Sequence, residues 1–377
     1  MNVLMISLDS GLLGVAKKGN VRERHKKYGE FVNQLDIIVL SNRGFKPYKL
    51  SENVHSYPTN SWHKAWAFWK AIRMGRKLAK GRNYDFITVQ DPFLTGLAAL
   101  FLKKKLGAKL LIGLHADFLN NPSWVKENPI QNRILDFLLK RVLPHADHVR
   151  SVSQGIKVKL TNEWGLRDDQ VTVIPTPLNI EVFQKTESDP QIVSSLYPGK
   201  KVILFVGRLE NQKDILTLLD AFKSAQVRDK RLVLVGEGTQ EEVLKNKVAG
   251  DHIEGVDFVG SKNHKELKNY YTRADILVLC SLNEGLPKVI IEAGLCGTPT
   301  IATDIDGSLE LIDDGVNGKF MKIGAAEVLA NHLELILGDD DLRKRMSQKA
   351  QEYAEKRVNT IDSYERIKKL WGNLAAS

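Results

Sequence analysis

Two carboxylates eight residues apart are the first candidates for chemistry in this chain. Glu284 stands in a polar turn rich in glycine and proline after the apolar run 276–279, and Glu292 follows in an apolar stretch of helical character. Eight residues make about two helical turns, so both side chains can face one groove. The pair could serve acid–base catalysis or hold a ligand. An unpaired carboxylate in apolar surroundings is costly, so Glu292 needs a partner, either a ligand such as a ribose diol or a structural Lys or Arg.

Two cations follow a glycine at the end of another predicted strand. The run 201–206 leads into Gly207, and Arg208 and Lys213 stand near the start of the next predicted helix. Because glycine allows close backbone approach and helix amino termini attract anions, this segment could hold a diphosphate. Gly236, in a second glycine-rich strand end, repeats the arrangement. For both segments the alternative is an ordinary turn without a ligand.

Polar residues also follow two predicted strands in the first half. His115 and Asp117 come after the run 108–114, and Asp91 comes after the run 85–90. A histidine at the carboxyl end of a strand opens onto the ligand cleft of a doubly wound sheet and can donate to a sugar hydroxyl, although a structural histidine is the alternative. Asp91 and Asp117 are candidates for acceptor binding or proton removal.

These motifs resemble family 4 of the GT-B glycosyltransferases over nearly the whole chain. The family signature is a Glu, seven residues, a second Glu and a later Gly-x-Pro, matched by Glu284, Glu292 and 297–299, while its Gly-Arg-Leu with a downstream Lys is matched in 207–213. The resemblance implies that Arg208 and Lys213 bind the donor diphosphate, that Glu292 binds ribose and that Glu284 holds sugar hydroxyls. The donor-binding residues so implied are Gly14, Gly207, Arg208, Lys213, Gly236, Glu284, Gly285, Leu286, Pro287, Lys288 and Glu292.

The resemblance also implies a reaction, namely retaining transfer of a hexose-type sugar from a nucleotide-diphosphate sugar. UDP is favoured by its frequency in the family, and GDP is possible. The nine histidines and two cysteines show no metal-ligand spacing, so we expect no metal or other cofactor. The residues expected to act in catalysis are His115, Glu284, Arg208 and Lys213. Ser10–Gly14 is not a Gly-x-Gly-x-x-Gly fingerprint, which counts against a dehydrogenase.

The elements that must position these residues follow an α/β pattern. Short apolar runs alternate with helical segments, which predicts parallel sheets in a GT-B fold of two doubly wound Rossmann-like domains facing a central cleft. The runs are 2–8, 35–40, 85–90, 108–114, 148–152 and 171–174, then 201–206, 232–235, 256–259, 276–279 and 299–302. Prolines between the two series mark a linker. We expect an acceptor-binding domain over 1–180, a nucleotide-sugar-binding domain over 181–360, and a C-terminal helix over 361–377 that could cross back to the first domain.

The charge is unevenly distributed along the 377 residues. Residues 1–180 hold 28 Lys and Arg against 14 Asp and Glu, whereas residues 181–377 hold 27 against 31. The first domain should therefore meet something anionic. Lys17 and Lys18 could receive a phosphate-bearing acceptor, or could belong to an ordinary exposed loop.

The segment 62–82 has no acidic residue and a helical period. One side is apolar, and the other combines tryptophans with cations, which is typical of a helix at an anionic bilayer interface. The residues expected to contact a membrane are Trp62, Trp66, Trp69, Arg73, Arg76, Lys77 and Lys80. This points to a lipid-linked acceptor. The alternative is a solvated helix whose tryptophans pack beneath a neighbouring loop.

The composition indicates where in the cell the protein acts and which other functions compete with transfer. Apolar residues make up 43% and charged residues 27%, which argues against disorder. With two cysteines, no leader-like start and no apolar run of the ~20 residues needed to span a bilayer, we expect a cytoplasmic protein, peripheral at the inner face of the membrane. A soluble sugar or sugar phosphate is the alternative acceptor, and a hydrolase or epimerase on the same scaffold is another alternative. A basic nucleic-acid-binding protein would leave Glu284 and Glu292 without a purpose.

Overall fold

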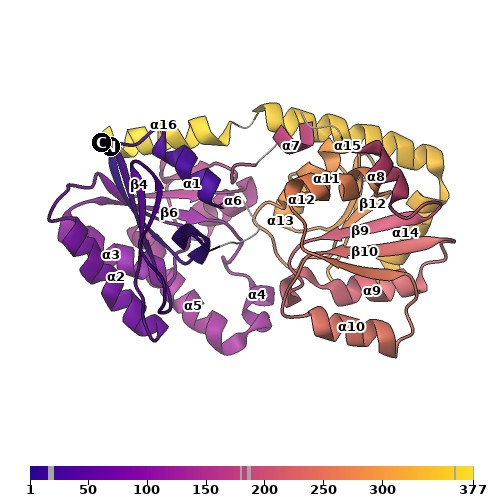
Figure 1. The fold of residues 1–377 in the computed structure, drawn as a ribbon, viewed down its shortest axis with the longest axis horizontal. Helices are drawn as coiled ribbons and strands as arrows, with labels where there is room; N and C mark the ends of the chain where they lie inside the picture. Colours follow the sequence, from indigo (N-terminus) through magenta and orange to yellow (C-terminus); the bar gives the residue numbers. More distant parts are fainter. Residues whose placement is uncertain (16–20, 179–180, 185–187, 361, 377) are drawn as a thin grey trace. The chain divides into compact units, whose positions relative to one another are not determined.

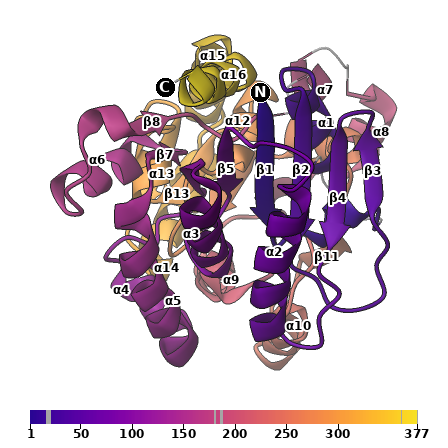
Figure 2. The same cartoon turned by 90° about the vertical axis from the view of Figure 1, so that its left-hand side faces the viewer.

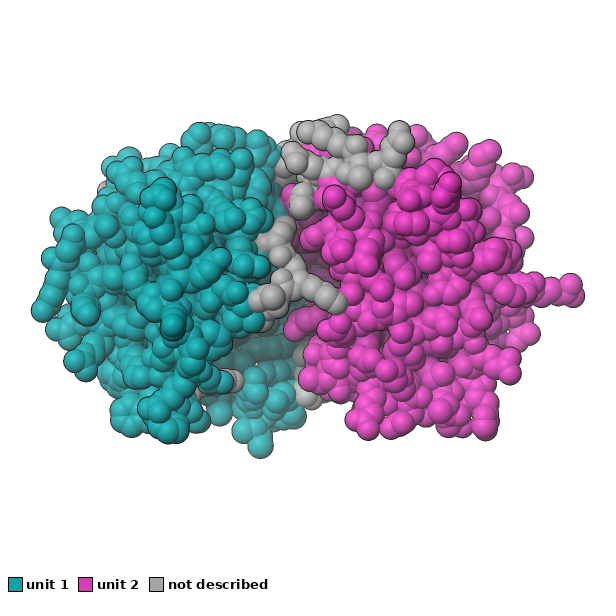
Figure 3. Space-filling model, in the orientation of Figure 1, with its two compact units in different colours: residues 1–177, 362–377 teal, residues 178–361 magenta. Residues whose placement is uncertain are grey.

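The computed structural model describes residues 1–15, 21–178, 181–184, 188–360 and 362–376. The chain forms two compact units (Figure 3). Unit 1 comprises Met1–Pro177 together with Asp362–Ser377, and unit 2 comprises Leu178–Ile361.

Unit 1 is built on an eight-stranded sheet with the order β3-β4-β2-β1-β5-β6-β7-β8. The strands pair in parallel except for β3, which runs antiparallel to β4 at the edge. The strands are β1 (Asn2–Ser7), β2 (Gln34–Val39), β3 (Tyr48–Ser51), β4 (Val54–Pro58), β5 (Phe86–Val89), β6 (Lys109–Leu114), β7 (His148–Ser151) and β8 (Val171–Val173). Their inner residues are buried because the central strands are continuous runs of Val, Ile and Leu, as expected for a sheet covered on both faces.

Helices cover both faces of this sheet. Figure 1 shows α2, α3 and α5 on one side and α1 with α16 on the other. The helices of unit 1 are α1 (Val21–Gly29), α2 (Lys64–Leu78), α3 (Leu94–Leu106), α4 (Pro122–Glu127), α5 (Pro129–Val142), α6 (Gln154–Asn162) and α16 (Ser363–Ala376), with 3-10 turns η1 (Ser10–Leu13), η2 (Leu143–His145) and η3 (Asp168–Gln170).

The C-terminal helix α16 is part of unit 1. Its Trp371 is buried and packs edge-on against Phe31 and Phe86, with Tyr28 5.2 Å away between ring centroids. Lys109 Nζ also donates to the carbonyl oxygen of Leu374 at 2.9 Å. Aromatic burial of this kind dominates local packing energy, so α16 is held firmly on the sheet of unit 1.

Unit 2 contains a six-stranded parallel sheet with the order β11-β10-β9-β12-β13-β14. Its strands are β9 (Lys201–Val206), β10 (Lys230–Val235), β11 (Val256–Gly260), β12 (Ile276–Leu279), β13 (Thr300–Thr303) and β14 (Gly318–Met321). Its helices are α7 (Glu181–Gln184), α8 (Pro190–Ser195), α9 (Ile215–Ser224), α10 (Glu241–Gly250), α11 (His264–Arg273), α12 (Lys288–Leu295), α13 (Asp306–Leu309), α14 (Ala326–Gly338) and α15 (Asp340–Thr360), with the 3-10 turn η4 (Asn211–Lys213). The expected α/β architecture with two parallel-sheet domains is confirmed.

Candidate active site

Two of the predicted donor-binding residues meet in unit 2. The turn after β12 brings Glu284 against Lys213, which stands at the end of η4, and the two side chains form an ion pair. Ser281 Oγ donates to the Oε1 atom of Glu284 at 2.9 Å. Each side chain of the pair is 14% exposed. The pair is therefore partly desolvated, and it still reaches the surface where a ligand can arrive.

The neighbouring segments are fixed to each other by amide contacts. Gln212 Nε2 donates to the backbone oxygen of Asn283 at 2.8 Å and to its side-chain oxygen at 2.9 Å. The N–H of Leu282 donates to the carbonyl oxygen of Gln212 at 2.8 Å. These bonds hold Lys213 and Glu284 in register, so the ion pair is preorganised rather than formed by two mobile side chains.

The glycines that follow β9 and β10 allow two backbone segments to approach each other closely. A Cβ atom on Gly236, whose φ is +148°, would lie 1.7 Å from the carbonyl oxygen of Gly207, and one on Gly238 would lie 2.2 Å from that of Leu209. Only glycine permits this approach. This packing explains the glycine at position 236 on structural grounds, and its expected donor contact stays a prediction. Arg208 is exposed, and it forms no ion pair within the described part of the chain.

The turn Gly285–Lys288 connects the carboxylate pair to α12. A Cβ atom on Gly307, at the start of α13, would lie 2.7 Å from the carbonyl oxygen of Gly285, so this turn packs tightly on the next strand end. Pro287 precedes the first residue of α12, and Leu286 and Lys288 are half-buried beside it. The first turn of α12 therefore lies next to Glu284, with the partial positive charge of a helix amino terminus.

Glu292 lies inside unit 2 with a phenol as its partner. The hydroxyl of Tyr271, on α11, donates to the Oε2 atom of Glu292 at 3.0 Å, and Tyr271 is fully buried. Burial raises the pKa of Glu292, while the bond from Tyr271 and the charges of His264 and Lys288 lower it. A partner for Glu292 was expected from the sequence, either a ribose diol or a structural Lys or Arg, and the protein partner that the structure shows is instead Tyr271, which no sequence pattern indicated.

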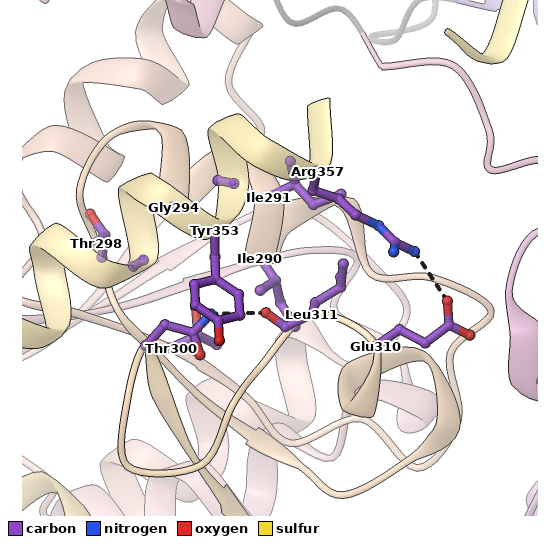
Figure 4. Close-up of a pocket in the computed structure, with 12 residues that line it drawn as sticks. Ile290, Ile291, Gly294, Thr298, Thr300, Glu310, Leu311, Tyr353 and Arg357 are labelled. Carbon is purple, nitrogen blue, oxygen red and sulfur yellow. Dashed lines mark hydrogen bonds and ion pairs between the residues drawn. The ribbon is translucent and has the colours of Figure 1, made fainter. Parts of the chain in front are cut away.

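A pocket of about 50 Å³ lies on another side of α12 (Figure 4). Ile290, Ile291 and Gly294 contribute to its wall, and Arg357 of α15 reaches Glu310 at 3.1 Å beside it. None of the predicted donor residues lines this pocket. It is the packing space between α12 and α15, where a Cβ atom on Gly294 would lie 2.8 Å from the carbonyl oxygen of Ala350.

In unit 1, His115 follows β6 and is half-buried. Its Nδ1 atom lies 3.1 Å from the hydroxyl oxygen of Thr176. Thr176 comes directly after two carbonyl groups that accept from the buried Arg150: Ile174 from Nε at 3.0 Å and Pro175 from a terminal nitrogen at 2.9 Å. Thr176 and Arg150 were missed by sequence reasoning, because their contacts with this region join residues that are distant in sequence.

The two aspartates at this edge have protein partners. Asp91 accepts the backbone N–H of Phe93 at 3.0 Å just before α3, and burial raises its pKa. Asp117 is buried and pairs with Lys159 of α6 at 2.6 Å. Both contacts belong to the scaffold of unit 1, and the expected acceptor role of these carboxylates stays a prediction.

Two further predicted positions lie near the start of the chain. Gly14 ends η1 with φ +81°, and a Cβ atom there would lie 2.8 Å from the ring of Tyr48, so the backbone requires glycine. Lys17 and Lys18 lie outside the described residues.

Helix α2 presents tryptophans to solvent. Trp62, just before the helix, is 76% exposed, and Trp66 and Trp69 are 64% and 57% exposed. The Arg43 guanidinium lies 3.3 Å from the centre of the Trp62 ring. The remaining predicted contact residues are also exposed, namely Arg73, Arg76, Lys77 and Lys80. The alternative, in which the tryptophans pack beneath a loop, is therefore wrong for Trp66 and Trp69.

No group of three or more His, Cys, Asp and Glu side chains in the described ranges could hold a metal ion. Over the same ranges, no helix has the length and apolar character needed to cross a bilayer.

Comparisons with known proteins agree with this geometry. The family described as Glycosyltransferase Family 4 matches residues 32–182, and the family described as Glycosyl transferases group 1 matches residues 188–353. The chain is a family 4 glycosyltransferase. Together the two matches cover every strand of both sheets except β1, and the segments that carry His115, Lys213, Glu284 and Glu292.

Relatives of this glycosyltransferase extend over most of its length. The Campylobacter jejuni GalNAc-alpha-(1->4)-GalNAc-alpha-(1->3)-diNAcBac-PP-undecaprenol alpha-1,4-N-acetyl-D-galactosaminyltransferase is 27% identical over 77% of this chain and 76% of its own. Among solved structures, sucrose-phosphate synthase from Thermosynechococcus elongatus has a TM-score of 0.86 at 21% identity, with all of both chains covered. The Anabaena protein HepE, solved with UDP-glucose, has a TM-score of 0.77 at 19% identity over 99% of this chain and 100% of its own. These likenesses establish the GT-B fold.

Proposed function

We propose that this glycosyltransferase moves a hexose-type sugar, with retention of configuration, from a nucleotide-diphosphate sugar to a hydroxyl of a lipid-linked or phosphate-bearing acceptor. UDP is the favoured nucleotide. The observation that carries the proposal is the preorganised Lys213–Glu284 pair at the strand ends of unit 2, next to the first turn of α12. The UDP-glucose bound by HepE and the undecaprenol-linked substrate in the name of the Campylobacter relative support the donor and acceptor classes.

On the donor side, the cations bind the diphosphate of the nucleotide sugar and the carboxylates bind its hydroxyl groups. Lys213 and the exposed Arg208 neutralise the charge that grows on the leaving diphosphate, helped by the helix amino terminus of α12, and no metal ion is needed for this. Glu284 accepts hydrogen bonds from sugar hydroxyls. Glu292 accepts from the ribose hydroxyls while Tyr271 holds its other oxygen.

In the transfer step, the acceptor oxygen bonds to the anomeric carbon as the bond from that carbon to the diphosphate breaks. Attack comes from the side of the leaving group, and the acceptor proton passes to the departing phosphate oxygen. His115 donates a hydrogen bond to a sugar hydroxyl, with Thr176 fixing its ring. This arrangement needs no protein nucleophile.

On the acceptor side, α2 docks the enzyme on an anionic membrane surface. Tryptophans suit the interface between headgroups and acyl chains, and Arg and Lys attract anionic headgroups, each adding about 1 kcal/mol near the surface. A soluble acceptor is the second candidate, favoured by the structural likeness to a sucrose-phosphate synthase. Vesicle co-sedimentation separates the two: a Trp66→Ser, Trp69→Ser, Arg73→Glu variant should pellet less than the wild type. Equal pelleting would favour the soluble acceptor.

The donor assignment is tested by a thermal-shift panel of nucleotide sugars on the wild type and on Glu292→Ala. A UDP-sugar should raise the melting temperature of the wild type and leave that of Glu292→Ala unchanged. Glu352→Ala, a surface change on α15, serves as the control and should respond like the wild type. If no nucleotide sugar shifts the wild type, the proposed donor class is wrong.

A further inference from the structure

Helix α5 exposes a row of large apolar side chains that the sequence reasoning did not single out. Ile130 is 80% exposed, Ile134 58% and Phe137 55%. Their spacing of four and three residues places them on one face of the helix. The opposite face is used for packing, since Leu139 and Val142 are fully buried in unit 1. The exposed row therefore does not contribute to the packing of α5 in unit 1.

Cations surround this row. Arg133, Lys140 and Arg141 are exposed, and the guanidinium carbon of Arg141 lies 5.2 Å from the centre of the Phe137 ring. The one acidic residue between Pro129 and Val142 is Asp136, which pairs with Lys140 at 2.7 Å. An isoleucine and phenylalanine stripe edged by long basic side chains is typical of a helix lying in a bilayer interface.

Exposed apolar side chains among cations also occur on the neighbouring helices α2 and α3. Helix α3 lies between α2 and α5 and contacts both (Figure 2). Phe101 of α3 is 46% exposed, and its ring centre lies 6.4 Å from that of Trp69. Lys104 and Lys105 of α3 are exposed, and no acidic residue occurs in Leu94–Leu106 or in Lys64–Leu78. Three neighbouring helices of unit 1 thus present apolar side chains among positive charges.

We propose that the Ile130–Ile134–Phe137 face of α5 inserts into an anionic bilayer as a second membrane contact, separate from α2. The proposal rests on the membrane docking included in the proposed function. A bilayer is the partner that fits, because exposed apolar side chains and net positive charge occur together on three helices and match acyl chains beneath anionic headgroups. Two contacts on different helices would fix the orientation of unit 1 on the membrane, whereas α2 alone would allow rotation about its axis.

An environment-sensitive dye tests the insertion directly. The full chain carrying Ile134→Cys is labelled with NBD and mixed with phosphatidylglycerol vesicles or phosphatidylcholine vesicles. The same dye on Leu335→Cys, an exposed position of α14 in unit 2, is the matched control, and labelled wild type gives the background from Cys280 and Cys296. We expect a blue shift and at least a twofold gain in emission at position 134 with the anionic vesicles alone. An unchanged spectrum at position 134 on vesicles that pellet the protein would overturn the proposal.

A triple variant measures the contribution of the row. Ile130→Ser, Ile134→Ser and Phe137→Ser together should lower partitioning onto phosphatidylglycerol vesicles about tenfold. The control triple is Val243→Ser, Val328→Ser and Leu335→Ser, three exposed apolar positions of unit 2 that should have no effect. Equal partitioning of the two triples would contradict the proposal.

The thermal shift caused by a UDP-sugar distinguishes failure of the α5 membrane contact from failure of the transferase proposal. UDP-sugar binding uses unit 2, so the α5 triple should keep the thermal shift and the melting temperature of the wild type. A lost shift would mean that the variant is misfolded, in which case the dye measurement decides. A wild type that binds donor but no vesicle would overturn membrane docking at both helices while leaving the transferase assignment intact.

Discussion

The two units differ in how their functional charges are partnered. In unit 2, Lys213 pairs with Glu284 and Tyr271 holds Glu292, so these three predicted donor-binding groups are oriented by neighbouring side chains, unlike the exposed Arg208. In unit 1, Arg73 and Arg76 of α2 are exposed and have no carboxylate partner among the described residues. Oriented, half-buried charges suit a small ligand with fixed geometry, while free surface charges suit an extended anionic surface. This contrast supports the proposal that unit 2 binds the donor and unit 1 meets the acceptor.

The largest effect should follow from removing the charge of Glu284. Glu284→Gln keeps the shape but weakens the hydrogen bonds to sugar hydroxyls and frees Lys213, so kcat/KM for the donor should fall by about two to three orders of magnitude. Steady-state release of nucleoside diphosphate measures this. Glu352→Gln on α15 is the control and should retain wild-type turnover. Wild-type rates in Glu284→Gln would show that the Glu284 carboxylate does not contribute to transfer.

Loss of the Tyr271 hydroxyl should raise the donor KM about tenfold with a smaller change in kcat. Tyr271→Phe removes a bond to a charged group, which is worth about 1.5–3 kcal/mol, and part of that loss appears as weaker ribose binding. Tyr270→Phe alters the neighbouring half-buried tyrosine and should leave KM unchanged. A kcat loss with an unchanged KM would show that Tyr271 does not act through the ribose contact.

Donor affinity should depend on pH through Glu292. Burial raises the pKa of this carboxyl above its usual value, so protonation begins at a higher pH than for an ordinary glutamate. Because the ionised form accepts from ribose, affinity for a UDP-sugar should fall several-fold as the pH falls through that raised pKa. Glu292→Gln should bind weakly with no such step, and fluorescence or calorimetric titration between about pH 5 and pH 8 measures the difference. A step of the same size in Glu292→Gln would assign it to another group.

A smaller effect is expected in unit 1, where Thr176 orients His115. Thr176→Val should lower kcat about three- to fivefold and leave the donor KM unchanged, because one neutral hydrogen bond contributes about 1 kcal/mol. Thr176→Ser keeps the hydroxyl and should restore the rate. Equal loss in both variants would mean that Thr176 acts through the backbone held by Arg150 instead.

Motifs whose function lies within one segment could be predicted from the sequence. The strand–turn–helix around Glu284 and the glycine with following cations were located correctly, because each joins neighbouring residues. The strands β3, β4 and β14 were missed, since Tyr48–Ser51, Val54–Pro58 and Gly318–Met321 are short and only partly apolar. Hydrophobic periodicity is weak in such strands.

Contacts between distant segments could not be predicted. Tyr271 is 21 residues from Glu292, and Thr176 is 61 residues from His115, so only the folded sheets bring them together. The same limit applies to Asp117, whose partner Lys159 is 42 residues away, whereas Asp91 accepts from the backbone of Phe93 two residues on. At position 236 the close backbone contact with Gly207 requires glycine whether or not a ligand binds there, and its donor-binding role stays a prediction.

The proposed nucleotide-sugar site of unit 2 is built on the Lys213–Glu284 pair. Isothermal titration of UDP into the wild type, Lys213→Met and the surface control Lys349→Met measures whether this pair binds the nucleotide. We predict saturable binding to the wild type and the control, and at least tenfold weaker binding to Lys213→Met, as expected for loss of a phosphate-binding charge. Equal UDP affinity in all three proteins would show that Lys213 does not bind the nucleotide.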